Sequence, residues 1–77
     1  MSVTKLKLNL NELKAERIRR GLSQEKLAEK LGQRANWVCR RESGITEITI
    51  PEFYQIAQAM GCTKEETSSL LRKMTGK

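Results

Sequence analysis

The hydrophobic residues of this 77-residue chain recur at the spacing of helices. Leu27, Ala28 and Leu31 fall on one side of a helix. A second stripe, with apolar residues three and four positions apart, consists of Phe53, Ile56, Ala57 and Met60. Such stripes are typical of amphipathic helices that turn their apolar side to a core. No uninterrupted apolar run approaches the length of a membrane span or a secretion signal.

Four short motifs contain the chemistry of a helix start, in which a side-chain oxygen accepts the unpartnered backbone N–H groups of the first turn. A full capping box, with Glu three residues after the capping residue, is predicted at Asn9, Thr49 and Thr63. Ser23 supplies a cap without the returning acid. Apolar pairs flank three of these starts at the spacing of a hydrophobic staple: Leu8 with Leu13, Leu22 with Leu27, and Ile48 with Phe53.

Proline and glycine mark the joints between these segments. Pro51 lies in a first turn, where its missing N–H has no effect, and glycines follow four helix ends: Gly21, Gly32, Gly44 and Gly61. The pattern predicts helices over residues 10–20, 23–31, 34–43, 50–60 and 63–74. The alternating KLKLNL before them predicts an extended arm or a short edge strand. We therefore predict an all-α fold, with an arm over residues 1–9 and one compact five-helix domain over residues 10–74.

The composition limits the chemistry that the chain can perform. It contains no His and no Asp, and its two cysteines, Cys39 and Cys62, are far apart and lack CxxC spacing. Most zinc sites and the usual acid–base and nucleophilic triads need those residues. We interpret both cysteines as small, semi-buried thiols in a reducing cytoplasm, and we expect no enzyme activity, no metal and no cofactor.

The positive charge is concentrated in the first part of the chain. Residues 1–44 contain eleven Lys and Arg against five Glu, whereas residues 45–77 contain four against four. The whole formal charge of +6 therefore lies before residue 45. A basic surface attracts polyanions and indicates nucleic acid, although a merely solvated surface has the same charge count.

Two predicted helices joined by LGQR at residues 31–34 match the helix-turn-helix pattern, with small Ala28 at the crossing and Gly32 in the turn. The segments ERIRRGLSQEKLAEKLG, WVCRRESG and PEFYQIAQAMG together resemble the lambda-repressor-like DNA-binding domain. Phage repressor and Cro proteins and regulators of the xenobiotic-response-element type share that domain. The resemblance covers about residues 10–70 and implies a compact five-helix lambda-repressor-like fold, with residues 34–43 in the major groove of DNA.

The resemblance also implies roles for single residues. Gln24 matches the glutamine that binds a DNA phosphate and braces the recognition helix. Arg17 and Glu42 match an ion pair that ties the first helix to the end of the recognition helix. The positions that reach base edges in the family are occupied here by Arg34, Ala35, Asn36 and Arg40.

Helical geometry independently predicts a polar outward face on residues 34–43. At 100° per residue, Val38 and Glu42 point away from a cluster formed by Asn36, Cys39, Arg40 and Ser43. Arg40 can bind guanine O6 and N7, and Asn36 can bind adenine N6 and N7. The alternatives are a solubilising charge for Arg40 and a simple preference for the helix start for Asn36.

Three further residues are candidates for contacts with DNA. Arg34 could bind a base or a phosphate, or act as a solubilising surface charge. Trp37 is predicted to lie partly on the protein with its N–H free for a phosphate, the alternative being core packing. Ser43, at the end of the outward face, is predicted to contact the DNA backbone.

The chain departs from the family pattern at three places. The turn lacks the usual Ser or Thr cap, which leaves Gln33 and Arg34 as candidates and implies a weaker cap or one replaced when DNA binds. Arg41 stands at a usually apolar position, where its stem can cover the core while its head reaches water. The loop ITEITI lacks basic residues, so backbone anchoring there stays open and Ile45 becomes a candidate for a partner surface.

These features predict a cytoplasmic transcriptional regulator without a membrane segment: a dimeric repressor that binds double-stranded operator DNA. Dimer contacts are expected from the N-terminal arm or from Leu70, Leu71 and Met74, although the same three residues could complete the core. The alternative is a protein-binding adaptor or an antitoxin-type module that uses the helix-turn-helix fold, with GITEITI as its contact.

Overall fold

The computed structural model describes residues 8–76, which form five α-helices and no strand. The helices, in chain order, are α1 (Leu10–Arg19), α2 (Gln24–Lys30), α3 (Ala35–Glu42), α4 (Ile50–Ala59) and α5 (Lys64–Thr75). Every bound lies within one residue of the prediction, and the all-α five-helix fold is confirmed. Of the predicted arm, residues 1–7 lie outside the described residues, and Leu8 and Asn9 are neither helix nor strand.

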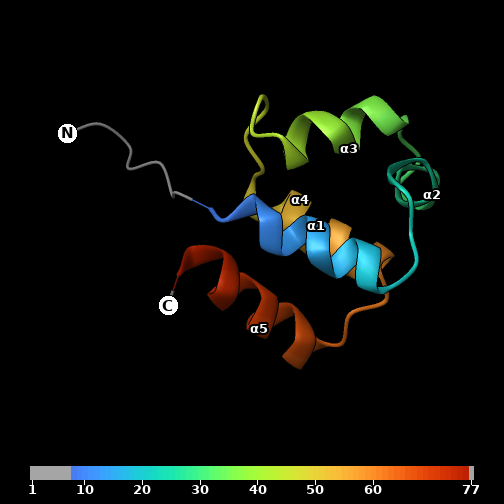
Figure 1. Cartoon of the computed structure of the whole chain (residues 1–77). Helices are drawn as coiled ribbons and strands as arrows, with labels where there is room; N and C mark the ends of the chain where they lie inside the picture. Colours follow the sequence, from blue (N-terminus) through green and yellow to red (C-terminus); the bar gives the residue numbers. More distant parts are fainter. Residues whose placement is uncertain (1–7, 77) are drawn as a thin grey trace.

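Helix α3 and the last helix α5 lie on opposite sides of α1 (Figure 1). Helix α2 packs against α3 and α4, while α5 packs against α1 and α4. In Figure 1, α2 is seen almost end-on while α3 runs across the view, so the two helices cross steeply. This arrangement leaves one side of α3 uncovered by the other helices.

The apolar stripes of all five helices meet in one core. Both residues Leu70 and Met74 are buried there, and Leu71 is half-buried against the cluster. Of the two alternatives for these residues, core packing is therefore the one that holds for Leu70 and Met74. The buried hydrophobic residues are Leu13, Leu27, Ala28, Val38, Phe53, Ile56, Ala57, Met60, Leu70 and Met74.

Local capping explains where three of the helices begin. The capping boxes at Thr49 and Thr63 are complete, because each threonine side chain and the following Glu accept each other's backbone N–H. Ser23 accepts a hydrogen bond from the Lys26 N–H at 3.0 Å, as predicted for a cap without a returning acid. These helix starts are thus determined by residues close together in the sequence.

The predicted capping box at Asn9 is wrong. The Asn9 side chain does cap α1, but it accepts from the Asn11 N–H at 3.2 Å, and Glu12 does not return a bond. The reason is tertiary: the Asn9 backbone N–H donates to the Met74 carbonyl oxygen at 2.6 Å, so it has no need of the Glu12 carboxylate. This bond joins the start of α1 to the end of α5.

A buried charge network fixes α3 against α1 and α2. Arg17 Nε and Nη2 donate to the two Glu42 carboxylate oxygens at 2.6 and 3.1 Å. Arg17 Nη1 donates to the Leu22 carbonyl at 2.7 Å, and Gln24 Nε2 donates to Glu42 Oε1 at 3.0 Å. No buried side-chain nitrogen or oxygen lacks a partner within the described part of the chain. The charges therefore keep the hydrogen bonds that water would otherwise supply.

Three glutamates outside this network, Glu16, Glu52 and Glu66, have a lowered pKa. Hydrogen bonds from Arg19 and Arg20 lower the pKa of Glu16, and a hydrogen bond from Arg41 lowers the pKa of Glu52. Arg20 also reaches Glu66, at the start of α5, at 3.1 Å. Ionised carboxylates thus help to join α1 to α5 and α3 to α4.

Replacing Glu42 by Ala is expected to lower the melting temperature. The substitution leaves the buried Arg17 guanidinium without a counter-charge, which typically costs about 3–5 kcal/mol. In a domain of this size that loss corresponds to roughly 10 °C or more. Thermal unfolding followed by circular dichroism measures the shift, with Glu29→Ala, on the exposed side of α2, as the matched control. An unchanged melting temperature in Glu42→Ala would show that the pair does not hold the fold.

Acid is expected to weaken the fold through Glu16 and Glu52. Because the pKa of each is lowered in the folded state, their stabilisation is complete above the unfolded glutamate pKa of about 4.3. It is lost as the pH falls through the lower folded pKa. Urea unfolding should therefore show Glu52→Gln to be more destabilising at pH 7 than at pH 3, whereas Glu29→Gln should differ little between the two. A pH-independent effect of Glu52→Gln would contradict the expectation.

Candidate nucleic-acid interface

The turn between α2 and α3 sets the direction of α3. Gly32 adopts a left-handed conformation with φ 68°, which glycine adopts without the strain of a side chain. The Gln33 N–H donates to the Ala28 carbonyl at 2.9 Å and closes the turn. Ala28 is fully buried, and its small side chain allows the close approach of the two helices.

The inward side of α3 packs against the core and binds residues of α1 and α2. Val38 lies in the core, and the Glu42 side chain, 5% exposed, binds Arg17 and Gln24. The inward directions of Val38 and Glu42 agree with those predicted from a rotation of 100° per residue. The bond from Gln24 joins the first residue of α2 to the last residue of α3, so Gln24 braces α3 within the protein itself.

Arg41 covers the edge of α3 and does not project into solvent. Its guanidinium carbon lies 3.9 Å from the Trp37 ring centroid, a cation–π geometry. Its Nε and Nη2 donate to the Glu52 carboxylate at 3.3 and 3.2 Å, and Nη1 donates to the Trp37 carbonyl at 3.3 Å. Arg41 therefore packs on Trp37 and links α3 to α4. The packing role predicted for it holds, but its head is paired with Glu52 where water was expected.

The outward side of α3 has the opposite character. Arg34, Asn36 and Arg40 are exposed together, and among residues 8–76 no salt bridge reaches either arginine. Ala35 is half-buried at the edge of this group. Of the three arginines on or beside α3, Arg41 is thus paired with a carboxylate, whereas Arg34 and Arg40, on the outward side, have no carboxylate partner within residues 8–76.

The Arg40 side chain makes one hydrogen bond within residues 8–76, to the loop that follows the helix. Its Nε donates to Thr46 Oγ1 at 3.3 Å. The Ser43 hydroxyl donates to the Arg40 carbonyl at 3.1 Å, so Ser43, although exposed at the predicted position, already uses its proton within the helix. A contact from Ser43 to a DNA phosphate would require that proton to change partner. The loop contact of Arg40 was not foreseen, because ITEITI has no periodicity that places Thr46 beside residue 40.

Trp37 combines both of the environments considered for it. The ring is half-buried and packs against the core beneath Arg41. The indole N–H makes no hydrogen bond to another residue in the range 8–76, and because no unpartnered polar side-chain atom is buried, it is open to solvent. Packing and an available donor are therefore compatible.

The start of α3 has no side-chain cap. Arg34 is the N-cap residue with extended backbone angles, φ −97° and ψ 158°, and forms no capping hydrogen bond. An arginine side chain contains only donors and cannot accept an N–H. Donor groups at the start of a helix attract anions. The uncapped start of α3 thus lies beside the exposed guanidinium of Arg34.

Of the two thiols predicted to be semi-buried, Cys62 agrees with the prediction and Cys39 does not. Cys39 is exposed, because it lies on the outward side of α3, where Asn36 lies between it and Arg40 around the helix. Cys62 is half-buried, and burial raises the pKa of its thiol. No group of three metal-binding side chains occurs within residues 8–76.

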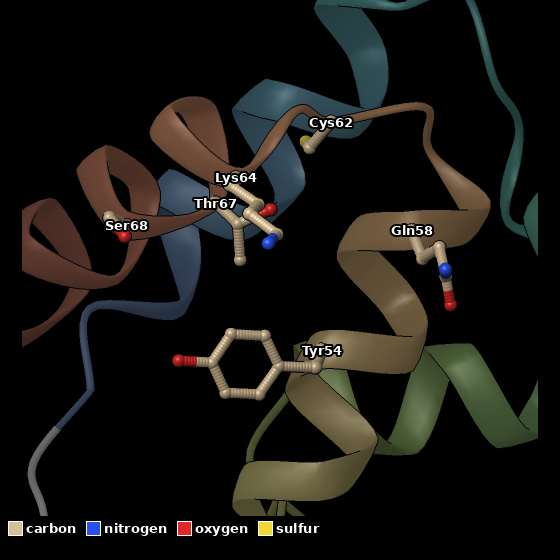
Figure 2. Close-up of a pocket in the computed structure, with 6 residues that line it drawn as sticks. All are labelled: Tyr54, Gln58, Cys62, Lys64, Thr67 and Ser68. Atoms are coloured by element: carbon tan, nitrogen blue, oxygen red, sulfur yellow. The ribbon is translucent and has the colours of Figure 1, made fainter.

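A groove lies between α4 and α5, away from the outward side of α3. Figure 2 shows the Tyr54 ring projecting from α4 across this groove toward α5. Its volume is about 410 Å³, and it is lined by Tyr54, Gln58, Cys62, Lys64, Thr67 and Ser68.

The described helices include none that is both long and apolar enough to span a membrane.

The arrangement agrees with a comparison against protein-family models. Residues 13–66 match the model of the helix-turn-helix family HTH_3. No curated protein and no solved structure gave a match to the chain. The matched segment contains the Arg17–Glu42 network, the turn at Gly32 and the whole of α3. The chain therefore belongs to the Cro/C1-type helix-turn-helix family, with a lambda-repressor-like domain typical of DNA-binding transcription regulators.

Proposed function

We propose that the chain is a sequence-specific DNA-binding repressor that inserts residues 34–43 into the major groove of an operator. The observation that carries this proposal is the division of charge on α3. Arg41 is paired with Glu52, whereas Arg34 and Arg40 face outward without a carboxylate partner in the described range 8–76. Unneutralised arginines beside an exposed Asn36 form a surface suited to bases and phosphates.

The side chains on this surface differ in what they can recognise. Arg40 can donate two parallel hydrogen bonds to guanine O6 and N7, and Asn36 can form a bidentate pair with adenine. Ala35 offers a small apolar contact at the same edge. Arg34 can bind either a base or the phosphate that approaches the uncapped start of α3. These four residues are the proposed readers of DNA sequence.

Contacts to the DNA backbone are proposed for Gln24, Trp37 and Ser43. The Gln24 amide donates one of its two Nε2 N–H groups to Glu42, which leaves the other for a phosphate. The free indole N–H of Trp37 is a second donor. Together with the basic excess of residues 1–44, these groups favour binding that weakens as salt increases.

Repression follows from covering a promoter, and a homodimer would bind two half-sites about 10–10.5 base pairs apart. We place this activity in the cytoplasm, with no cofactor or metal needed for binding. An adaptor or antitoxin-type role is the second candidate, and the exposure of Ile45, at 71%, favours it. An adaptor would bind duplex DNA weakly and with little dependence on salt.

For the dimer we propose a surface on α4 and its neighbours, because Leu70 and Met74 are buried in the core. Ile50 and Tyr54 lie one helical turn apart and are 48% and 50% exposed, and Tyr54 lines the α4–α5 groove. Residues 45–77 have no net charge, so two copies can meet there without the repulsion of their basic parts.

Selection from a random duplex pool should recover a sequence with two half-sites, and Arg40→Ala should relax base preference at one position in each. The expected loss there is about 1–3 kcal/mol of discrimination, because a bidentate contact to a base is removed. Binding is measured by fluorescence anisotropy at two salt concentrations.

Arg72→Ala is the matched control, because Arg72 is an exposed arginine on α5, across α1 from α3 (Figure 1). It should leave base preference unchanged. Equal weakening of Arg40→Ala on every sequence would make Arg40 a phosphate contact. Absence of salt-dependent binding by the unaltered protein would instead favour the adaptor role.

Tyr54→Ala is expected to weaken self-association by about tenfold, since truncating an interface tyrosine commonly removes more than 1 kcal/mol. Sedimentation equilibrium over a range of protein concentrations measures the dissociation constant. Ile18→Ala is the control, because Ile18 is similarly exposed, at 57%, but lies on α1. An equal effect of both substitutions, or none of either, would rule out the proposed α4 surface.

A further inference from the structure

The loop after α3 is bonded to Arg40, the proposed reader of guanine. The Arg40 Nε–H donates to Thr46 Oγ1 at 3.3 Å, and the Thr46 backbone N–H donates to the Arg40 carbonyl at 3.1 Å. The two bonds run in opposite directions between the same two residues. The backbone bond thus fixes Thr46 beside the helix, and the Thr46 side chain accepts the hydrogen bond from the guanidinium.

The turn at Gly44 brings Thr46 into this position. Gly44 has φ 85°, and its N–H donates to the Arg41 carbonyl at 3.3 Å. After this residue the chain folds back beside the end of α3 before it enters α4 (Figure 1). Thr46 is half-buried there, whereas its neighbour Ile45 is exposed. The hydroxyl is consequently held by the fold.

The contact selects which edge of the guanidinium is available. An arginine side chain has five N–H donors, and Thr46 occupies the single donor on Nε. The four donors on Nη1 and Nη2 remain at the outer end, in the geometry that pairs with guanine O6 and N7. A side chain held in this way also loses less conformational freedom when it binds.

We propose that Thr46 is a positioning residue for base recognition, which orients the Arg40 guanidinium without touching the base itself. This inference rests on the proposed function, because it requires Arg40 to read DNA. It adds to the recognition surface a residue from a loop that has no basic side chain. Specificity for guanine then depends on a hydroxyl six residues beyond the reading arginine.

The test compares Thr46→Val with Thr46→Ser. Valine keeps the shape of threonine but removes the acceptor oxygen, whereas serine keeps that oxygen; both retain the backbone bond to Arg40. Each variant is titrated with four duplexes that differ only at the position where Arg40→Ala relaxes preference. Thr46→Val is expected to lower the preference for guanine about three- to tenfold, and Thr46→Ser to retain it.

A double-mutant cycle separates positioning from direct contact. If Thr46 acts through Arg40, adding Thr46→Val to Arg40→Ala changes the preference no further. Equal weakening on all four duplexes by Thr46→Val would identify a phosphate contact and overturn the positioning role. A preference that Arg40→Ala relaxes but Thr46→Val leaves intact would also overturn it, with the proposed function unaffected. If the unaltered protein has no base preference, the proposed function itself fails.

Discussion

The buried contact between the Arg17 guanidinium and the Glu42 carboxylate is the constraint on which the position of α3 depends. Arg17 belongs to α1, Glu42 ends α3, and the Leu22 carbonyl and the Gln24 amide complete the same network. A buried charge is stable only where such partners replace water. Rotating or sliding α3 would separate at least one of them. The inside of the molecule thereby determines which residues of this helix face outward.

Arg40 and Arg41, adjacent in the sequence, show how far this constraint reaches. Arg41 lies over the Trp37 ring and binds Glu52, so its charge serves the contact between α3 and α4. Arg40, turned by 100° around the helix, donates its side-chain hydrogen bond to an uncharged hydroxyl. The same residue type thus contributes to packing at one position and to the charge of the surface at the next. Partners, more than residue identity, distinguish the two.

The sequence predicts the helices well because their starts and ends depend on nearby residues. Ser23, Thr49 and Thr63 cap the helices that follow them, and so determine where α2, α4 and α5 begin. Prediction fails where a distant group intervenes: the Met74 carbonyl takes the Asn9 N–H that Glu12 was expected to bind. The inward direction of Val38 and Glu42 follows from helical geometry, whereas pairing Glu42 with a residue 25 positions earlier required the family pattern. Thr46 was missed because an irregular loop has no period from which to place it.

The hydrogen bond from the Asn9 N–H to the Met74 carbonyl has a topological meaning beyond the capping of α1. It brings the first residue before the first helix into direct contact with the last turn of the final helix. The two ends of a helical domain that lie this close can be joined by a short linker, and new ends can then be opened in an exposed turn such as that at Gly61. The domain is therefore suited to circular permutation, since the order of its helices along the chain could change while their packing stays the same.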